Sequence, residues 1–82
     1  MNKHSQLPVW LQVVDFVRMY PNGVGRLDVA IDFGITKATA IEHLEKAVDR
    51  NKIVKTYTWV GPRSRGWIYY ASDSPFAETG ER

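Results

Sequence analysis

The 82-residue sequence contains no cysteine and only two histidines, His4 and His43. Without cysteine, the chain has no disulfide, no thiolate metal site and no thiol nucleophile. A structural zinc site normally needs four ligands, so the two histidines of one chain cannot build a common zinc site. No glycine-rich phosphate loop follows a strand-like run, and no nucleophile–base pair has a recognisable context. We therefore expect no metal, no cofactor and no enzymatic activity.

Long apolar runs are also missing. No stretch approaches the ~20 apolar residues needed to span a bilayer, and residues 1–6 are polar, unlike a signal peptide. We expect a cytoplasmic protein, in the cell that makes or hosts it, with no membrane partner. A chain this short forms one domain with a small core. We therefore expect no pocket of ~300 Å³ or more in a single chain and no small-molecule effector.

Acidic residues are absent from one part of the sequence. Between Arg50 and Ser72 there are five cations and no Asp or Glu, whereas the rest of the chain holds six cations and nine acids. The net charge of +2 conceals this asymmetry. A concentrated positive patch is typical of a protein that binds a polyanion, although a solvated charged surface would have the same composition.

The first helical pattern runs from about Pro8 to Tyr20. Proline suits the first turn of a helix, because its missing N–H would be unpaired there. The apolar residues surround most of this helix, which indicates two surfaces to bury. One would face the core of the chain. The other would face either an extended tail or a second copy of the chain, and we take Trp10, Val13 and Val17 as the candidate homodimer interface.

Two further helices are expected over about Arg26–Phe33 and over Lys37 to about Arg50. Gly34 can end the first of these in a left-handed conformation, and Thr36 is a candidate N-cap for the second. Asn51 occupies the position where a helix often ends in a left-handed residue. The core-facing stripe of the later helix consists of Ala40, Ile41, Leu44, Ala47 and Val48.

A β-hairpin is expected next. The run Ile53–Val60 is dense in β-branched and aromatic residues, residues 61–66 have the composition of a loop, and Trp67–Ala71 forms the returning strand. The hairpin contains five large rings: Tyr57, Trp59, Trp67, Tyr69 and Tyr70. Such rings stack on the bases of single-stranded nucleic acid or pack one face of the hairpin onto the helices, and we favour packing.

The chain thus divides into a disordered N-terminal segment (1–7), one domain (8–71) and a polar C-terminal tail (72–82). Within the domain, Leu27–Lys55 resembles the helix-turn-helix core of winged-helix regulators such as the MarR and ArsR families. The resemblance lies in the Gly34-Ile35 turn, the Thr36 cap and the close of the helix at Asn51, where the family commonly has glycine. It implies an α+β, mainly α fold, a winged helix-turn-helix of three helices followed by a β-hairpin wing.

In the families that the chain resembles, the third helix enters the major groove of DNA, where base edges are distinguishable. The positions that this resemblance assigns to the groove are Thr36, Lys37, Ala38, Thr39 and Glu42. It also places the wing along the DNA backbone, with Arg63, Arg65 and Lys55 as phosphate contacts. The third helix is net neutral, however, and Glu42 could instead form an i,i+4 pair with Lys46 that only supports the helix.

We therefore predict a sequence-specific double-stranded DNA-binding protein, a transcriptional regulator such as a repressor, acting as a homodimer. Two alternatives stay open. One is a winged-helix protein–protein adaptor, which the neutral third helix favours. The other is an architectural protein in replication, recombination or partition, which the sequence does not separate from a transcriptional regulator. The acid-free wing favours DNA binding.

Overall fold

The computed structural model describes residues 7–73 of the protein, so most of the expected N-terminal segment and tail lie outside the described residues. The elements are α1 (Val9–Arg18), α2 (Arg26–Phe33), α3 (Lys37–Asp49), β1 (Ile53–Gly61) and β2 (Ser64–Ala71). The two strands form one antiparallel hairpin. The chain is a small α+β domain of three helices followed by a hairpin, as predicted, and this order is compatible with a winged-helix layout.

The helix boundaries follow the residues that cannot continue a helix. Pro8 is the N-cap of α1, which ends at Arg18, about two residues before the predicted end, with Met19 as its C-cap. Gly34 ends α2 with a φ of 66°, and Asn51 follows α3 with a φ of 62°. Glycine and asparagine tolerate this left-handed region better than other residues do. Both predicted stops are confirmed.

The hairpin is longer than the sequence predicted. Gly61 pairs with Ser64, so only Pro62 and Arg63 form the turn, and β2 begins three residues before the expected Trp67. Composition indicated a six-residue loop, but after an irregularity between Trp59 and Gly61 the strand pairing resumes at Gly61 and Ser64. A short third segment was not predicted. Val24, between α1 and α2, exchanges two backbone hydrogen bonds with Tyr69 of β2, at 2.9 and 2.8 Å.

The core lies where α1, α2, α3 and the base of the hairpin meet. Its fully buried large side chains are Leu44, Ile53, Val13, Val17 and Val29. The predicted stripe of α3 is confirmed for Ala40, Leu44 and Ala47, which have no exposed surface. Val48 is half-buried against the core, and Ile41 is half-buried outside it. The hairpin joins this core through Ile53 and Tyr69, so its base is fixed to the helices.

Two residues of the expected dimer interface belong to this core instead. Val13 and Val17 are 0% exposed within a single chain and have no surface to offer a partner. Assigning them to an interface was wrong, because a helix that is apolar all round does not reveal which side faces its own core. Trp10 of α1 is half-buried against the core, and the cationic groups of Lys46 and Arg50 of the α3 end lie 5.8 and 5.4 Å from its ring centroid, so its role in a dimer stays a prediction.

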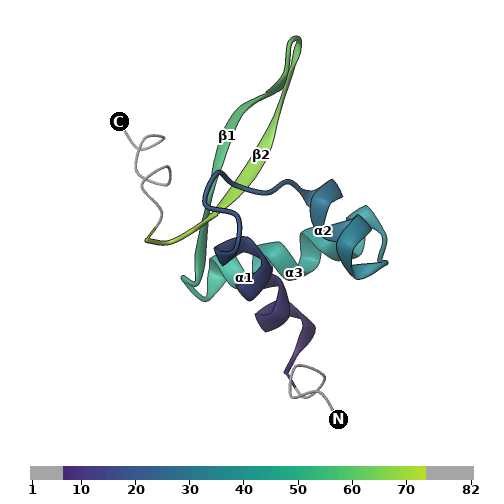
Figure 1. The fold of residues 1–82 in the computed structure, drawn as a ribbon, viewed down its shortest axis with the longest axis vertical. Helices are drawn as coiled ribbons and strands as arrows, with labels where there is room; N and C mark the ends of the chain where they lie inside the picture. Colours follow the sequence, from purple (N-terminus) through teal and green to yellow (C-terminus); the bar gives the residue numbers. More distant parts are fainter. Residues whose placement is uncertain (1–6, 74–82) are drawn as a thin grey trace.

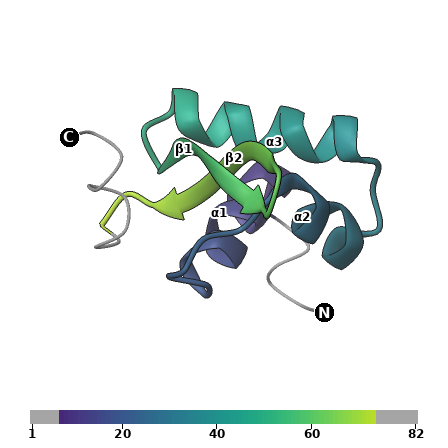
Figure 2. The same ribbon diagram turned by 90° about the horizontal axis from the view of Figure 1, so that it is seen from above.

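The hairpin projects well beyond the helices, as Figure 1 shows. In the view of Figure 2, α3 runs along one side of the domain and α1 and α2 lie on the other. The base of the hairpin is therefore part of the domain, whereas its outer half stands in solvent. The sequence predicted the hairpin but not how far it extends past the helices.

Candidate nucleic-acid interface

The start of α3 is exposed and capped. Thr36 is the N-cap, and its Oγ1 accepts a hydrogen bond from the backbone N–H of Thr39 at 3.1 Å, as predicted. The Thr36 hydroxyl also lies 3.0 Å from the Thr39 hydroxyl. Lys37 and Ala38 are exposed beside them. The positive end of the helix dipole therefore opens to solvent together with a lysine side chain.

Glu42 is exposed one turn further along α3. The expected pair between Glu42 and Lys46 is absent from the ion pairs of residues 7–73. Lys46 lies over the Trp10 ring instead. The carboxylate of Glu42 is thus available to a hydrogen-bond donor of a partner. The alternative that Glu42 only supports the helix required an ion pair with Lys46, which is not observed.

A hollow of about 480 Å³ separates the hairpin from the starts of α2 and α3. Arg26, Lys37 and Arg65 line it, each from a different element, and we call it the basic hollow. Arg26 and Lys37 are the first residues of their helices, so two helix N-termini border the same space. Asp28 is the one acidic residue in the lining, and one of its oxygens accepts from the backbone N–H of Gly25 at 2.9 Å.

Within residues 7–73 no carboxylate forms an ion pair with Arg26, Lys37 or Arg65, and the one acid of the lining, Asp28, leaves an excess of positive charge in the basic hollow. Such a concave, positively charged space attracts anions and concentrates them near the protein. Sequence reasoning missed Arg26, although it is the first residue of the predicted second helix. Only the folded arrangement brings that position opposite the hairpin.

The two arginines of the hairpin have different surroundings. Arg63 lies in the turn and is exposed. Arg65 lies in β2, directly opposite Trp59 of β1, and its guanidinium carbon is 4.6 Å from the centroid of the Trp59 indole. This cation–π contact holds the guanidinium of Arg65 against the Trp59 ring and leaves its positive charge in place.

Lys55 is less available than the sequence suggested. Its Nζ forms an ion pair with both carboxylate oxygens of Glu45 of α3, at 2.8 and 2.9 Å. The same Nζ lies 4.5 Å from the ring centroid of Trp67. A lysine that is already paired adds little net charge to a phosphate-binding surface. We therefore assign Lys55 a structural role in joining the hairpin to α3.

Glu45 also accepts a hydrogen bond from the hydroxyl of Tyr69, at 2.8 Å. Burial acts to raise the pKa of Glu45, but the hydrogen bonds from Lys55 and Tyr69 and the lysine charge together lower it below its usual range. For Tyr69, burial and the neighbouring carboxylate both raise the pKa of the hydroxyl. Each group therefore stays in the protonation state that keeps the hydrogen bond.

The expectation that the rings of the hairpin pack on the helices holds for Tyr69, which is 2% exposed. It is wrong for three of the five, because Trp59, Tyr57 and Trp67 are 59%, 54% and 41% exposed. Alternation along a strand tells which residues share a face. It does not tell how much of that face the helices cover, and here they cover only the base.

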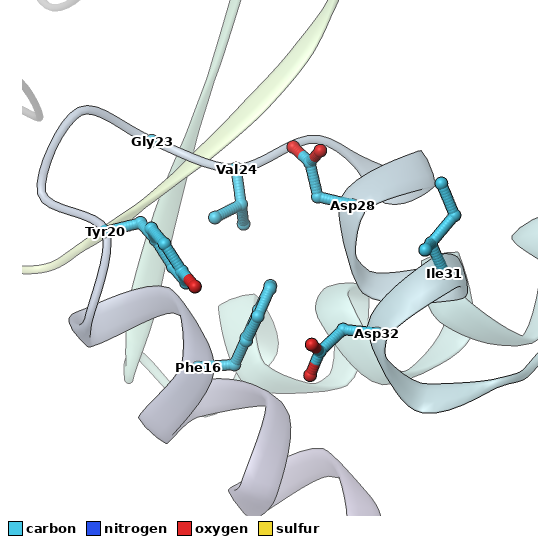
Figure 3. Close-up of a pocket in the computed structure, with 7 residues that line it drawn as sticks. All are labelled: Phe16, Tyr20, Gly23, Val24, Asp28, Ile31 and Asp32. Carbon is cyan, nitrogen blue, oxygen red and sulfur yellow. The ribbon is translucent and has the colours of Figure 1, made fainter.

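A second hollow, of about 310 Å³, lies between α1 and α2. Figure 3 shows Phe16, Tyr20 and Asp32 directed toward its centre, with Asp28 and Ile31 at its border. From the sequence we expected no pocket of ~300 Å³ or more in a single chain, and that expectation was wrong. It considered only the small core, whereas this hollow lies at the surface between two helices. The hollow is open to solvent rather than enclosed, and Asp28 of α2 borders both this hollow and the basic hollow.

Among residues 7–73, no group of three or more metal-ligating side chains is arranged to hold a metal ion. None of the helices in the same range is long and apolar enough to cross a bilayer. Comparison with known families, curated proteins and solved structures finds no match to this chain. The functional argument therefore depends on the residues and geometry of the chain itself.

Proposed function

We propose that the protein binds double-stranded DNA in a sequence-specific manner and acts as a transcriptional regulator, with the winged helix-turn-helix as its fold. The observation that carries this proposal is the basic hollow. It brings Arg26, Lys37 and Arg65 together from two helix starts and the hairpin, and no carboxylate of residues 7–73 pairs with them. Cations held along one surface are what the phosphates of a duplex require.

In this proposal α3 supplies the base contacts. Lys37 could donate to a guanine edge, Ala38 or Thr39 could touch a thymine methyl group, and Glu42 could accept from a cytosine amino group. Thr36 keeps the first turn of α3 intact and leaves its N–H groups beside a phosphate. These side chains are short or singly charged. Discrimination would therefore come from a few contacts, each of about 1–3 kcal/mol at best.

The hairpin would act as the wing and supply phosphate contacts. Arg63 in the turn and Arg65 beside the basic hollow are its candidates, and a narrow minor groove attracts arginine. Arg26 joins this set, and Lys55 leaves it because of its pair with Glu45. Phosphate contacts fix the position of the protein on the duplex, whereas base contacts select the sequence.

The test is binding to a mixed pool of duplex DNA at several salt concentrations. The logarithm of affinity should fall linearly with the logarithm of salt, and each lost phosphate contact should flatten the slope by about 0.9. We expect this flattening for Arg63→Ala and Arg65→Ala. Arg18→Ala is the matched control, because it removes an equal charge from an exposed position at the end of α1. Equal effects of all three substitutions would refute the proposed interface.

A protein–protein adaptor is the second candidate, and exposed apolar side chains favour it. Ile31 is 72% exposed and borders the hollow of Figure 3. Met19, the C-cap of α1, is 69% exposed. Isolated apolar residues are common on protein surfaces, so this observation carries less than the basic hollow. An adaptor would show little affinity for duplex DNA at any salt concentration.

The homodimer is also a proposal, now without Val13 and Val17 as its contacts. A dimer would allow two half-sites about one helical turn apart to be bound together. Sedimentation decides the question, since a dimer has twice the monomer mass of 9.4 kDa. A single species of monomer mass at a protein concentration of tens of micromolar would end this part of the proposal. That concentration is roughly a thousand times, or more, the dissociation constants typical of specific DNA binding.

A further inference from the structure

One face of the hairpin carries an exposed row of rings and cations, which we call the aromatic face. Side chains alternate between the two faces of a strand, so Lys55, Tyr57 and Trp59 of β1 share a face. The register places Trp67 opposite Tyr57, and Arg65 opposite Trp59. The centroids of Tyr57 and Trp67 are 5.1 Å apart with a tilt of 59° between the rings.

The base of this same face is buried, whereas its outer part is not. Ile53 and Tyr69 belong to the core, but Tyr57, Trp59 and Trp67 are each more than two-fifths exposed. Figure 1 shows why, because the outer half of the hairpin extends beyond all three helices. Packing against the helices therefore does not explain Tyr57 and Trp59, and Trp67 only borders the basic hollow beside the helix starts. Threonine favours the strand conformation as the aromatic residues do, so the stability of the hairpin alone does not require large rings at these exposed positions.

The charges of the aromatic face favour one class of partner. Arg65 lies over Trp59, 4.6 Å from the ring centroid, and no carboxylate of residues 7–73 pairs with it, whereas Lys55, which lies over Trp67, is already paired with Glu45. No Asp or Glu occurs anywhere from Ile53 to Ala71. A partner should therefore combine negative charge with flat surfaces that stack on rings. Single-stranded nucleic acid has both properties, because phosphates alternate with bases.

The spacing of the rings agrees with an extended strand. Trp59 and Trp67 lie on opposite strands as diagonal neighbours in the register, ~7–8 Å apart, which is about twice the 3.4 Å rise per nucleotide within one strand of a duplex. Bases that stack in turn on Trp67 and Trp59 must therefore be separated from each other rather than stacked together. A closed duplex does not present its bases in this way, since their faces are covered by neighbouring base pairs.

We propose that the aromatic face binds unpaired bases of single-stranded DNA, which stack on Trp59 and on the Tyr57–Trp67 pair. The inference extends the proposed function and rests on it for the phosphate contacts of Arg63 and Arg65. Its consequence is a preference for DNA in which a single-stranded stretch adjoins a duplex. The start of α3 and the basic hollow would bind the duplex, and the outer hairpin would bind the unpaired bases.

The experiment measures binding of an oligothymidylate of about 12 nucleotides, a length within the range of single-strand sites, and of a blunt duplex of mixed sequence. Binding is followed by fluorescence anisotropy of labelled DNA and by quenching of tryptophan emission. The variants are Trp59→Ala and Trp67→Ala, with Trp59→Phe retaining a ring. Thr58→Val is the matched control, because Thr58 adjoins Trp59 but points to the opposite face.

The expected result is that each tryptophan-to-alanine variant weakens oligothymidylate binding by about 5-fold to 150-fold, the range for one lost base stack. Duplex affinity should fall by a smaller factor, because Trp59 acts on the duplex only through its contact with Arg65, and Trp67 is only one of the residues that line the basic hollow. Trp59→Phe should recover most of the single-strand affinity, and Thr58→Val should change neither affinity. Cooperative thermal unfolding of both alanine variants, well above the temperature of the binding assay, shows that they keep the fold.

Two results would overturn the inference. The first is an oligothymidylate affinity of the intact protein that both alanine variants leave unchanged. The second is undetectable single-strand binding alongside normal duplex binding, which would leave the proposed function standing. The converse result, tryptophan-dependent single-strand binding without any duplex binding, would support the aromatic face and refute the duplex proposal.

Discussion

Replacing Glu45 with alanine should loosen the joint between α3 and the hairpin. The Glu45 carboxylate accepts hydrogen bonds from Lys55 at 2.8 and 2.9 Å and from the Tyr69 hydroxyl at 2.8 Å. Tyr69 is 2% exposed, so the loss of its acceptor should cost about 1–3 kcal/mol. The side chains of Lys55 and Glu45 are 29% and 35% exposed, and water screens their attraction to about 0.2–1 kcal/mol.

The two contributions amount to about 1–4 kcal/mol for Glu45→Ala, a substantial part of the roughly 4–12 kcal/mol expected for a domain of this size. A loss of about 2 kcal/mol should lower the melting temperature by roughly 8–16 °C. The assay is chemical and thermal unfolding followed by circular dichroism. Glu42→Ala is the matched control, because it makes the same change at an exposed position of α3 and should cost less than about 0.5 kcal/mol.

A difference of less than about 0.5 kcal/mol between Glu45→Ala and Glu42→Ala would refute this reasoning. Glu45→Gln gives an intermediate case. Its amide oxygen can still accept from Tyr69, but it has no charge to pair with Lys55. We expect it to cost less than alanine, because the buried hydroxyl keeps an acceptor.

Three further predictions concern stability. Gly23→Ala should cost at least about 2 kcal/mol, because the backbone has a φ of 101° and the new Cβ would lie 2.5 Å from Cγ2 of Ile68. Gly66→Ala, with its nearest contact at 3.4 Å, is the control, and equal unfolding free energies would contradict the account. Thr36→Ala should cost about 1 kcal/mol through loss of the α3 cap, and Thr36→Ser should restore most of it; an alanine variant as stable as the parent would count against the cap. The lowered pKa of Glu45 means that its ionised carboxylate stabilises the folded state. This contribution is fully present above about pH 4.5, the ordinary pKa, and is lost as the pH falls through the lower pKa of the folded state. Acid titration of Glu45→Gln should show less of this loss.

The parts of the fold that depend on local sequence were predictable. Gly34 and Asn51 end helices because few residues tolerate a positive φ, and Thr36 caps α3 because its hydroxyl reaches an N–H three residues on. The core stripe of α3 follows from helical spacing. In each case the cause lies within a few residues of the effect.

The parts that depend on tertiary arrangement were not predictable. Val13 and Val17 face the core because α3 and the hairpin lie on that side of α1, which helical spacing alone does not indicate. Arg26 enters the candidate site only because α2 begins opposite the hairpin. The exposure of Trp59 follows from the length of hairpin that extends beyond the helices. The pairing of Lys55 with Glu45 likewise joins residues ten positions apart on different elements.

The central claim is that the start of α3 and the hairpin face DNA together. Backbone amide chemical shifts, recorded while duplex DNA is added to isotope-labelled protein, test it most directly. The account predicts the largest changes at residues 36–39, at Arg63 and Arg65, and at Arg26. Changes centred on Ile31 and the hollow between α1 and α2, or no change at a duplex excess, would contradict it.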